Sequence, residues 1–236
     1  MNNKSTIQEI QERFDNDVER FSNLNTGQIS TVDAAISLEL TTESAKRICP
    51  KAKELLDIGT GAGNYTLKML SKIPNLNCTM VDLSQPMLNR AHERVEKETS
   101  GSIKCLQGDI REVSLEENKY DIILAGAVLH HLRDDSDWET VFSKLYKILK
   151  KGGCLMISDL ITQDTPILNE YFTERYAEYL SGFGGSDYAK NVLAYIEKED
   201  SPRSLNYQLA LMKEVGFSQT EILHKNICFA AYCGIK

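Results

Sequence analysis

The sequence predicts a doubly wound α/β fold, in which helices cover both faces of a mostly parallel sheet. Short apolar runs of strand length recur along the chain, and amphipathic helical periods separate most of them. Such runs describe strands that are buried on both faces, and each parallel crossover must be long enough to hold a helix. Three glycines at alternate positions follow the first run, in LLDIGTGAGNYT (55–66). Because ligands of this fold class bind beyond the carboxyl ends of the strands, this turn marks the candidate site.

Seven apolar runs are candidate strands. They cover residues 53–58, 77–83, 102–107, 120–128, 153–160, 219–226 and 227–235. The clearest helical period lies over 137–149, where apolar residues recur at the spacing of one helix face. Gly152 and Gly153 follow it and predict a left-handed helix cap. Another helix is expected to begin at Ser84, a good N-cap, with Pro86 in its first turn.

Two regions interrupt this alternation. Residues 6–48 precede the first strand and predict an N-terminal helical cap of two helices. Residues 163–204 follow the fifth strand and predict a helical insertion, with two helices joined by SGFGGS (181–186). Five of the ten tyrosines lie in this insertion, which suits a lid or a wall of a substrate site. Packing of these rings onto the sheet is an equally good interpretation.

The composition disfavours several classes of function. The chain has 236 residues and a mass of 26.6 kDa, so we expect one domain over 1–236. Its 27 basic and 34 acidic residues give a net charge of −7, which makes binding to nucleic acid or to anionic membranes over the whole surface unfavourable. The start has no apolar stretch of signal-peptide length, and no run reaches the roughly 18 apolar residues of a spanning helix. We therefore expect a cytoplasmic protein with no membrane partner.

The six cysteines form neither a ligand pattern nor a disulfide pattern. They are scattered, with no C-x-x-C pair and no histidine at ligand spacing. Four of them lie within or beside apolar, strand-like runs, which is typical of reduced core thiols. We therefore expect neither a metal site nor disulfides.

The glycine turn over 59–63 indicates a bound ligand. Glycines let the backbone turn tightly and let a ligand approach the main chain, and the free amides of the next helix favour a carboxylate or phosphate. A dinucleotide fingerprint requires a glycine where Asn64 stands. A phosphate-binding P-loop requires a lysine in the turn, and none follows until Lys68. Both nucleotide-phosphate interpretations are therefore disfavoured.

Carboxylates also follow the next two candidate strands. Asp82 ends the second run about 20 residues beyond the glycines, where an acid can accept hydrogen bonds from ribose hydroxyls. Asp109 follows the third run, and its carboxylate could accept from an adenine amino group while Ile110 lies on the ring. Three acids at successive strand ends, counting Asp57, are much less expected by chance than one.

Five motifs together resemble the class I S-adenosylmethionine-dependent methyltransferase family. They are DIGTGAG, VDLS, GDI, YDIILAGAVLHHL and LKKGGCLMISD, in the order and spacing of that family, and they cover roughly residues 50–160. The resemblance implies a Rossmann-like sheet of seven strands in the order 3-2-1-4-5-7-6, with the last strand antiparallel. It also implies S-adenosylmethionine as cofactor and S-adenosylhomocysteine as product.

The resemblance assigns cofactor contacts to this chain. Gly59, Thr60 and Gly61 correspond to contacts with the methionine part, Asp82 and Leu83 with the ribose, and Asp109 and Ile110 with the adenine. Ala125, at the end of the fourth strand, and Met87 complete the set. The methionine end of the cofactor is a zwitterion, so main-chain amides suit its carboxylate, and carbonyls or Asp57 suit its ammonium group.

Methyl transfer places few demands on the protein. Since the sulfonium is already a strong methyl donor, the main task is to hold the acceptor in line with the S–CH₃ bond and to exclude water. A general base is needed only if the acceptor must lose a proton. The candidate catalytic residues are His130, for which His131 is an alternative, and Asp159 at the end of the fifth strand. One histidine could instead cap a strand end and contact the cofactor.

Other interpretations stay open. The FDNDV opening (14–18), the aromatic insertion and the FAAYCGIK ending are also similar to carboxy-S-adenosylmethionine synthase, which modifies the cofactor itself for tRNA wobble-uridine synthesis. That enzyme holds the added carboxylate with an arginine of the insertion, where this chain has Lys190, and the two residues are not equivalent at a bidentate site. A non-catalytic cofactor-binding protein is a third interpretation. For an enzyme, the acidic chain favours a small-molecule acceptor over RNA or protein. The oligomeric state stays open, a homodimer included.

Overall fold

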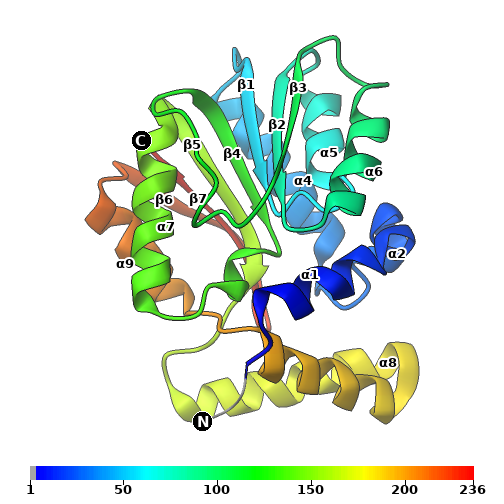
Figure 1. Cartoon of the computed structure of the whole chain (residues 1–236). Helices are drawn as coiled ribbons and strands as arrows, with labels where there is room; N and C mark the ends of the chain where they lie inside the picture. Colours follow the sequence, from blue (N-terminus) through cyan, green and yellow to red (C-terminus); the bar gives the residue numbers. More distant parts are fainter. Residues whose placement is uncertain (1–3) are drawn as a thin grey trace.

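One sheet of seven strands forms the centre of the molecule, in the order β3-β2-β1-β4-β5-β7-β6 (Figure 1). The structure, a computed structural model, describes residues 4–236. Strands β1 to β5 pair in parallel, and β7 is antiparallel to both β5 and β6. The predicted fold class and strand order are therefore confirmed. The strands are β1 (Glu54–Ile58), β2 (Asn77–Asp82), β3 (Ile103–Gln107), β4 (Tyr120–Gly126), β5 (Leu149–Leu160), β6 (Gln219–Asn226) and β7 (Phe229–Ile235).

Local backbone geometry explains where the strand boundaries differ from those predicted. Strand β4 ends at Gly126 because Ala127 takes a left-handed conformation with φ 52°, and Ile227, with φ 50°, makes the turn before β7. The predicted helix cap at Gly152 and Gly153 is wrong. Leu149 already pairs with Tyr120, so pairing in β5 replaces a helix cap there.

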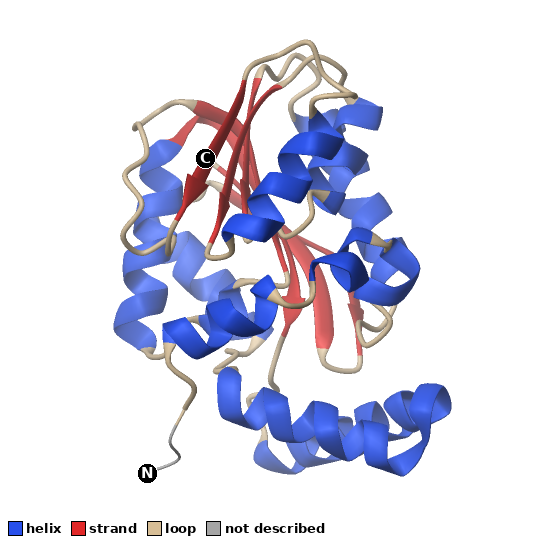
Figure 2. Cartoon of the chain, turned by 45° about the vertical axis from the view of Figure 1, so that its right-hand side comes forward, coloured by secondary structure: helices blue, strands red, loops and turns tan. Residues whose placement is uncertain are grey.

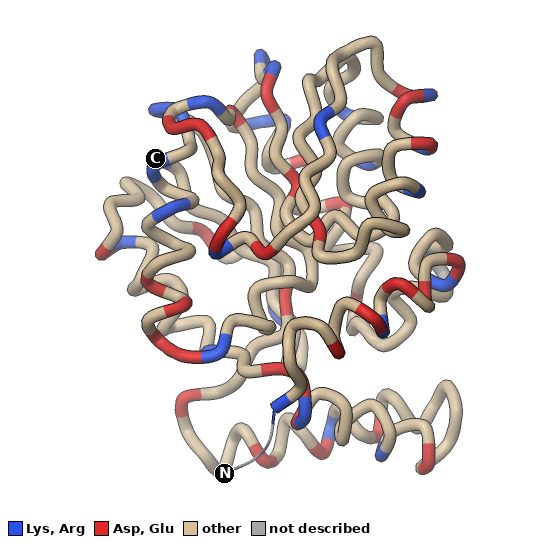
Figure 3. The backbone as a smooth tube through the Cα atoms, in the orientation of Figure 1, with Lys and Arg blue, Asp and Glu red and all other residues tan. Residues whose placement is uncertain are grey.

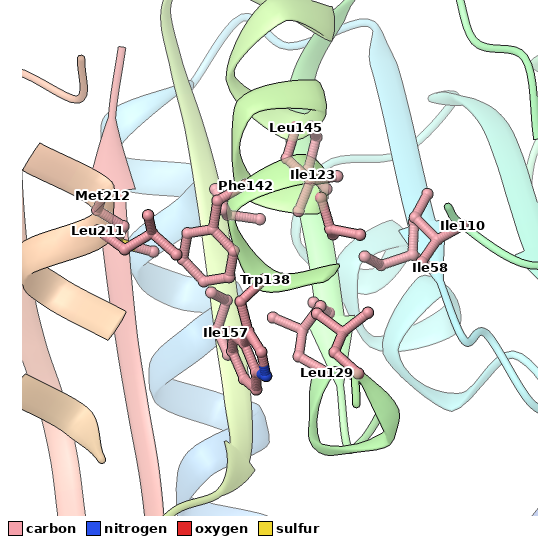
Figure 4. Close-up of a cluster of buried hydrophobic side chains, with 14 of the residues drawn as sticks. Ile58, Ile110, Ile123, Leu129, Trp138, Phe142, Leu145, Ile157, Leu211 and Met212 are labelled. Carbon is pink, nitrogen blue, oxygen red and sulfur yellow. The ribbon is translucent and has the colours of Figure 1, made fainter. Parts of the chain in front are cut away.

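Helices cover both faces of the sheet (Figure 2). Alternate residues of β1 supply two separate cores, since Leu56 and Ile58 pack on one face and Leu55 packs on the other. Figure 4 shows the first core, in which Trp138 and Phe142 of α7 lie against the sheet. One face is covered by α4 (Ala34–Ile48), α5 (Asn64–Lys72) and α6 (Gln85–Val95), the other by α7 (Asp135–Ile148) and α9 (Leu205–Val215).

The helix that begins after Ser84 forms as predicted. The Ser84 hydroxyl accepts a hydrogen bond of 3.2 Å from the Met87 amide, and proline lies in the first turn of α6. This cap fixes the start of α6 directly beyond the carboxyl end of β2.

The first helices of the N-terminal cap and the insertion lie beyond the carboxyl ends of the parallel strands (Figure 1). Residues 6–48 contain four helices where two were predicted: α1 (Ile7–Asp15), α2 (Val18–Ser22), α3 (Leu24–Gly27) and α4. The insertion forms α8 (Pro166–Glu199), whose two helical arms meet at the non-helical residues Gly184 and Gly185. No helix within residues 4–236 is both long enough and apolar enough to cross a membrane.

Replacing Trp138 tests the core between α7 and the sheet. Trp138 is fully buried, so Trp138→Ala should lower the free energy of unfolding by about 3–5 kcal/mol, because it leaves a large cavity. Urea denaturation measures this change. The control is Ile167→Ala, whose side chain is 72% exposed and which should change stability by less than about 0.5 kcal/mol. Similar losses in the two variants would contradict this description of the core.

Candidate active site

The glycine turn connects β1 to α5 and has a backbone that only glycine adopts easily. Gly59 and Gly61 have φ of 62° and 52°. A Cβ at Gly59 would lie 2.4 Å from Cγ2 of Val128, so this glycine lets the turn pack against the loop after β4. A Cβ at Gly61 would meet no atom within 4 Å. The turn therefore presents Gly61 to open space, where a ligand can approach the main chain.

Asp57 fixes the turn from within β1. Its side chain is buried, and Oδ2 accepts hydrogen bonds from the hydroxyls of Thr60 (3.0 Å) and Thr66 (2.6 Å). Burial raises the pKa of Asp57 to about 6, although these two hydroxyls oppose the shift. Asp57 is therefore a carboxyl group that a nearby cation would readily ionise.

Asp82 joins the end of β2 to the same turn. Its Oδ2 accepts from the Gly61 amide at 2.7 Å, and its Oδ1 accepts from the Ser84 amide at 2.9 Å. Burial raises the pKa of Asp82 to about 6, while the two amides lower it and the charge of Asp15 raises it. Leu83 beside it is half-buried, whereas Met87 is only 1% exposed.

Asp109, beyond β3, is held by an arginine. Nε of Arg111 lies 2.9 Å from Oδ1 of Asp109, and Nη2 lies 2.5 Å from Oδ2. Burial would raise the pKa of Asp109, but the hydrogen bonds and charge of Arg111 lower it, so the group is ionised at neutral pH. Ile110 and Ala125 are both buried in the first core, Ala125 beside Ile58 of β1. The role of Arg111 was not predicted, although its position two residues after Asp109 allows the contact.

His130 and Asp159 form a buried pair between β4 and β5. His130 lies in a short 3₁₀ helix, η1 (Leu129–His131), and its Nδ1 contacts Oδ1 of Asp159. The Asp159 carboxylate also accepts from the amides of Leu129 and Leu160, each at 2.7 Å. Burial alone would lower the pKa of His130, but Asp159 and Asp200 outweigh it and raise the pKa to about 9. The two carboxylates thus favour the protonated form of His130, whereas a general base must be neutral.

Asp200 brings the insertion into this cluster. It follows α8, its side chain is 1% exposed, and its Oδ1 lies 3.1 Å from Nδ1 of His131. Burial and the neighbouring charge of His130 lower the pKa of His131. Asp200 was not predicted as a site residue, because no sequence pattern connects the end of the insertion to the HHL segment (130–132).

Helix α1 lies over both the glycine-turn residues and the cluster of His130, His131 and Asp200. The ring of Phe14 lies edge-on to His131, with ring centroids 6.0 Å apart, and Arg13 makes a bidentate ion pair with Glu199 at the end of α8. Oδ1 of Asp15 is buried and has no hydrogen-bond partner among the described residues, and its charge acts on Asp82. The N-terminal cap therefore adds a carboxylate to the glycine-turn group, which the sequence analysis missed.

Lys190, at the place discussed for a carboxylate-binding arginine, points into solvent. Its side chain is 77% exposed, and the nearest acidic oxygen, on Asp187, is 3.8 Å away. Lys190 is therefore not placed to hold a carboxylate at the strand ends.

Comparisons with known proteins agree with this arrangement. A family model described as a methyltransferase domain matches residues 55–153. A demethylmenaquinone methyltransferase of Bacteroides fragilis is 24% identical to the chain over 93% of the chain and 89% of its own length. The structure of human N-acetylserotonin methyltransferase with S-adenosylmethionine superposes with a TM-score of 0.61 at 14% identity. It aligns with 98% of this chain, which spans 57% of the human one.

A second solved structure gives the same result. Phosphoethanolamine N-methyltransferase 2 of Haemonchus contortus, in complex with S-adenosyl-L-methionine, superposes with a TM-score of 0.58 at 24% identity. It aligns with 89% of this chain, which spans 45% of that protein, so the chain covers less than two thirds of both solved relatives. The strand order and the methyltransferase-domain match over residues 55–153 show that the chain has the fold of class I S-adenosylmethionine-dependent methyltransferases and is similar to members of that family.

Proposed function

We propose that the chain transfers a methyl group from S-adenosylmethionine to a small-molecule acceptor by in-line displacement at the carboxyl edge of the sheet. The observation that carries this proposal is the contact between Asp82 and the Gly61 amide, which brings two strand ends and the open face of the turn to one place. When bound, the cofactor supplies an activated methyl group on a sulfonium. The remaining tasks belong to residues of this chain.

The cofactor-binding roles follow from the chemistry of each group. The main chain at Gly59, Thr60 and Gly61 would lie against the methionine part, with the amides of Thr60 and Gly61 donating to Val81 and Asp82, and Asp57 would receive the ammonium group. Each oxygen of Asp82 accepts one amide and retains a second lone pair, which suits ribose hydroxyls. Asp15 has an unpartnered buried oxygen close by and is a further candidate for this contact. Asp109 would accept from the adenine amino group next to Ile110, sharing its oxygens with Arg111.

The acceptor would lie between the insertion and the end of β5. A cavity of about 160 Å³ lies there, with mainly apolar walls from both arms of α8, including Phe172, Tyr176 and Leu193. It also holds Thr162 and Asn169, so it suits an apolar group with one or two polar substituents. The relatives named above act, by their names, on small molecules, and acidic and basic residues are interspersed over the chain (Figure 3), which favours a small acceptor over nucleic acid.

A two-stage experiment tests this function. Calorimetry should show one S-adenosylhomocysteine bound per chain, and formation of that product should then be followed with phenolic, quinol, amine and phospho-base acceptors. Acceptor-dependent product with at least one class is expected. Binding without transfer to any class would favour a non-catalytic protein, and a copurified ligand with the mass of the carboxylated cofactor would favour the synthase.

Gly61→Ala tests the open face of the turn. A Cβ there meets no protein atom, so stability should fall by only about 1–2 kcal/mol from the left-handed backbone. Affinity for S-adenosylhomocysteine should fall at least tenfold, because the methyl group occupies the ligand's approach. The matched control is Gly152→Ala, which has a φ of 78° and open space but lies at the opposite edge of the sheet. Equal affinities in the two variants would contradict the assignment.

The raised pKa values of Asp57 and Asp82 predict a pH dependence. A carboxyl whose pKa is raised by folding stabilises the fold below its unfolded value near 4, and this contribution is lost as pH rises through about 6. The affinity for a ligand that binds only the ionised carboxylates has the opposite pH dependence, so it rises as the pH rises. Affinity for the cofactor should therefore be nearly full above pH 7 and lower at pH 5 by roughly tenfold for each of the two carboxyls that must ionise, with proton release on binding near pH 6. Calorimetry in two buffers checks both, and affinity that is flat from pH 5 to 7.5 would count against these contacts.

Two substitutions separate cofactor binding from transfer. Asp82→Ala should weaken cofactor binding at least tenfold, because it removes both the ribose acceptor and the support of Gly61. His130→Ala should lower turnover while leaving cofactor affinity within about twofold, since His130 contacts Asp159 and not the glycine turn. Calorimetry and single-turnover kinetics measure the two effects. If His130→Ala lost both equally, its role would be structural.

A further inference from the structure

Two histidines and an aspartate from distant parts of the chain converge beside the ends of β4 and β5. The donor atoms are Nε2 of His130, Nδ1 of His131 and Oδ1 of Asp200, and all lie within 4.8 Å of one another. Oδ1 of Asp200 is 3.1 Å from the His131 nitrogen and 3.8 Å from the His130 nitrogen. All three side chains are at most 16% exposed.

Two of these three atoms have only each other as a polar contact. Nδ1 of His131 and Oδ1 of Asp200 are both buried and lie 3.1 Å apart, and neither makes a well-aligned hydrogen bond within residues 4–236. Leaving a buried polar atom unpaired typically destabilises a protein by about 1–3 kcal/mol, more if it is charged. A proton on His131 would satisfy both atoms, and so would a cation bound between them.

We propose that His130, His131 and Asp200 bind one divalent transition-metal ion, with zinc-like coordination. Zinc forms bonds of about 2.0–2.2 Å to imidazole nitrogen and carboxylate oxygen, so tetrahedral ligand atoms lie about 3.4 Å apart. The distances of 3.1 and 3.8 Å bracket this value. Two imidazoles and one carboxylate are a ligand set suited to zinc, iron or manganese ions, and less suited to magnesium or calcium.

Asp159 completes this arrangement as a residue that orients a ligand. Metal-binding histidines usually direct their second ring nitrogen to a carboxylate, and Nδ1 of His130 contacts Asp159 in this way. The amides of Leu129 and Leu160 fix Asp159 in turn. This leaves Nε2 of His130 directed toward Asp200.

Two basic side chains lie near the cluster. The Arg13 guanidinium, which acts on His130, is paired with both oxygens of Glu199, and Nζ of Lys4 contacts the main-chain oxygen of Asp200. Three protein ligands also leave one tetrahedral position open. Within the proposed function, an acceptor hydroxyl would bind at that position through its oxygen, and its proton would pass to solvent water before the oxygen attacks the methyl group. This role depends on the proposed function, whereas the metal site itself does not.

Cobalt(II) binding to the full chain tests the proposal. After treatment with a chelator, the protein is titrated with Co²⁺ while visible absorption and heat are recorded. We expect one ion per chain, with the ligand-field bands of a nitrogen and oxygen site and without the charge-transfer band of thiolate ligands. This second readout separates the proposed site from the six free cysteines.

Variants assign the ion to the cluster. Asp200→Asn and His131→Gln should each lower Co²⁺ affinity at least tenfold. The matched control is His92→Gln, an exposed histidine beside Glu96, which should keep affinity within twofold. If Asp200→Asn does not fold, His131→Gln decides alone, because the His131 side chain is less buried than that of Asp200, at 16% against 1% exposed.

Three results would overturn the site: binding well below one equivalent, a thiolate band, or affinity unchanged in His131→Gln. Cofactor affinity is measured on the same samples. Loss of metal binding with intact cofactor binding would reject only the metal site. Metal binding without cofactor binding would reject only the proposed function.

Discussion

The hydrogen bond from the Gly61 amide to Asp82 is the constraint on which the candidate cofactor site depends. It joins the end of β2 to the turn after β1, two segments that the parallel sheet already places side by side. Burying a carboxylate is unfavourable unless hydrogen bonds satisfy it, and the amides of Gly61 and Ser84 do so here. Asp57 fixes the other side of the turn through two threonine hydroxyls. The turn therefore has its shape before any ligand arrives, which lowers the entropy lost on binding.

The same physical arrangement recurs at β4 and β5. Asp159, at the end of β5, accepts main-chain amides on both sides and holds His130 after β4. Helix α1 connects the two groups, since Asp15 acts on Asp82 while Phe14 packs on His131. The N-terminal cap and the insertion thus add side chains to the site at the carboxyl edge of the sheet, where the strands end in polar main-chain groups. A change in either element would affect cofactor and acceptor together.

The sequence predicts the fold and the strand-end residues because both follow from short-range patterns. Apolar runs, helical periods and a glycine turn are read within a dozen residues, and parallel pairing then brings Asp57, Asp82 and Asp109 to one edge. Asp15 and Asp200 could not be found in this way, because they reach the site only through packing of the cap and the insertion. The helix cap expected at Gly152 failed for a related reason: pairing of β5 with β4 outweighed a local preference.

A crystal structure of the chain with S-adenosylhomocysteine would test most directly whether the strand-end carboxylates and the glycine turn bind one cofactor. The account predicts density for the adenosyl group between Asp82 and Asp109, with the amino acid end against the main chain of residues 59–61 and its ammonium group near Asp57. Density for the ligand elsewhere, or Asp82 and Asp109 turned away from it, would contradict the account.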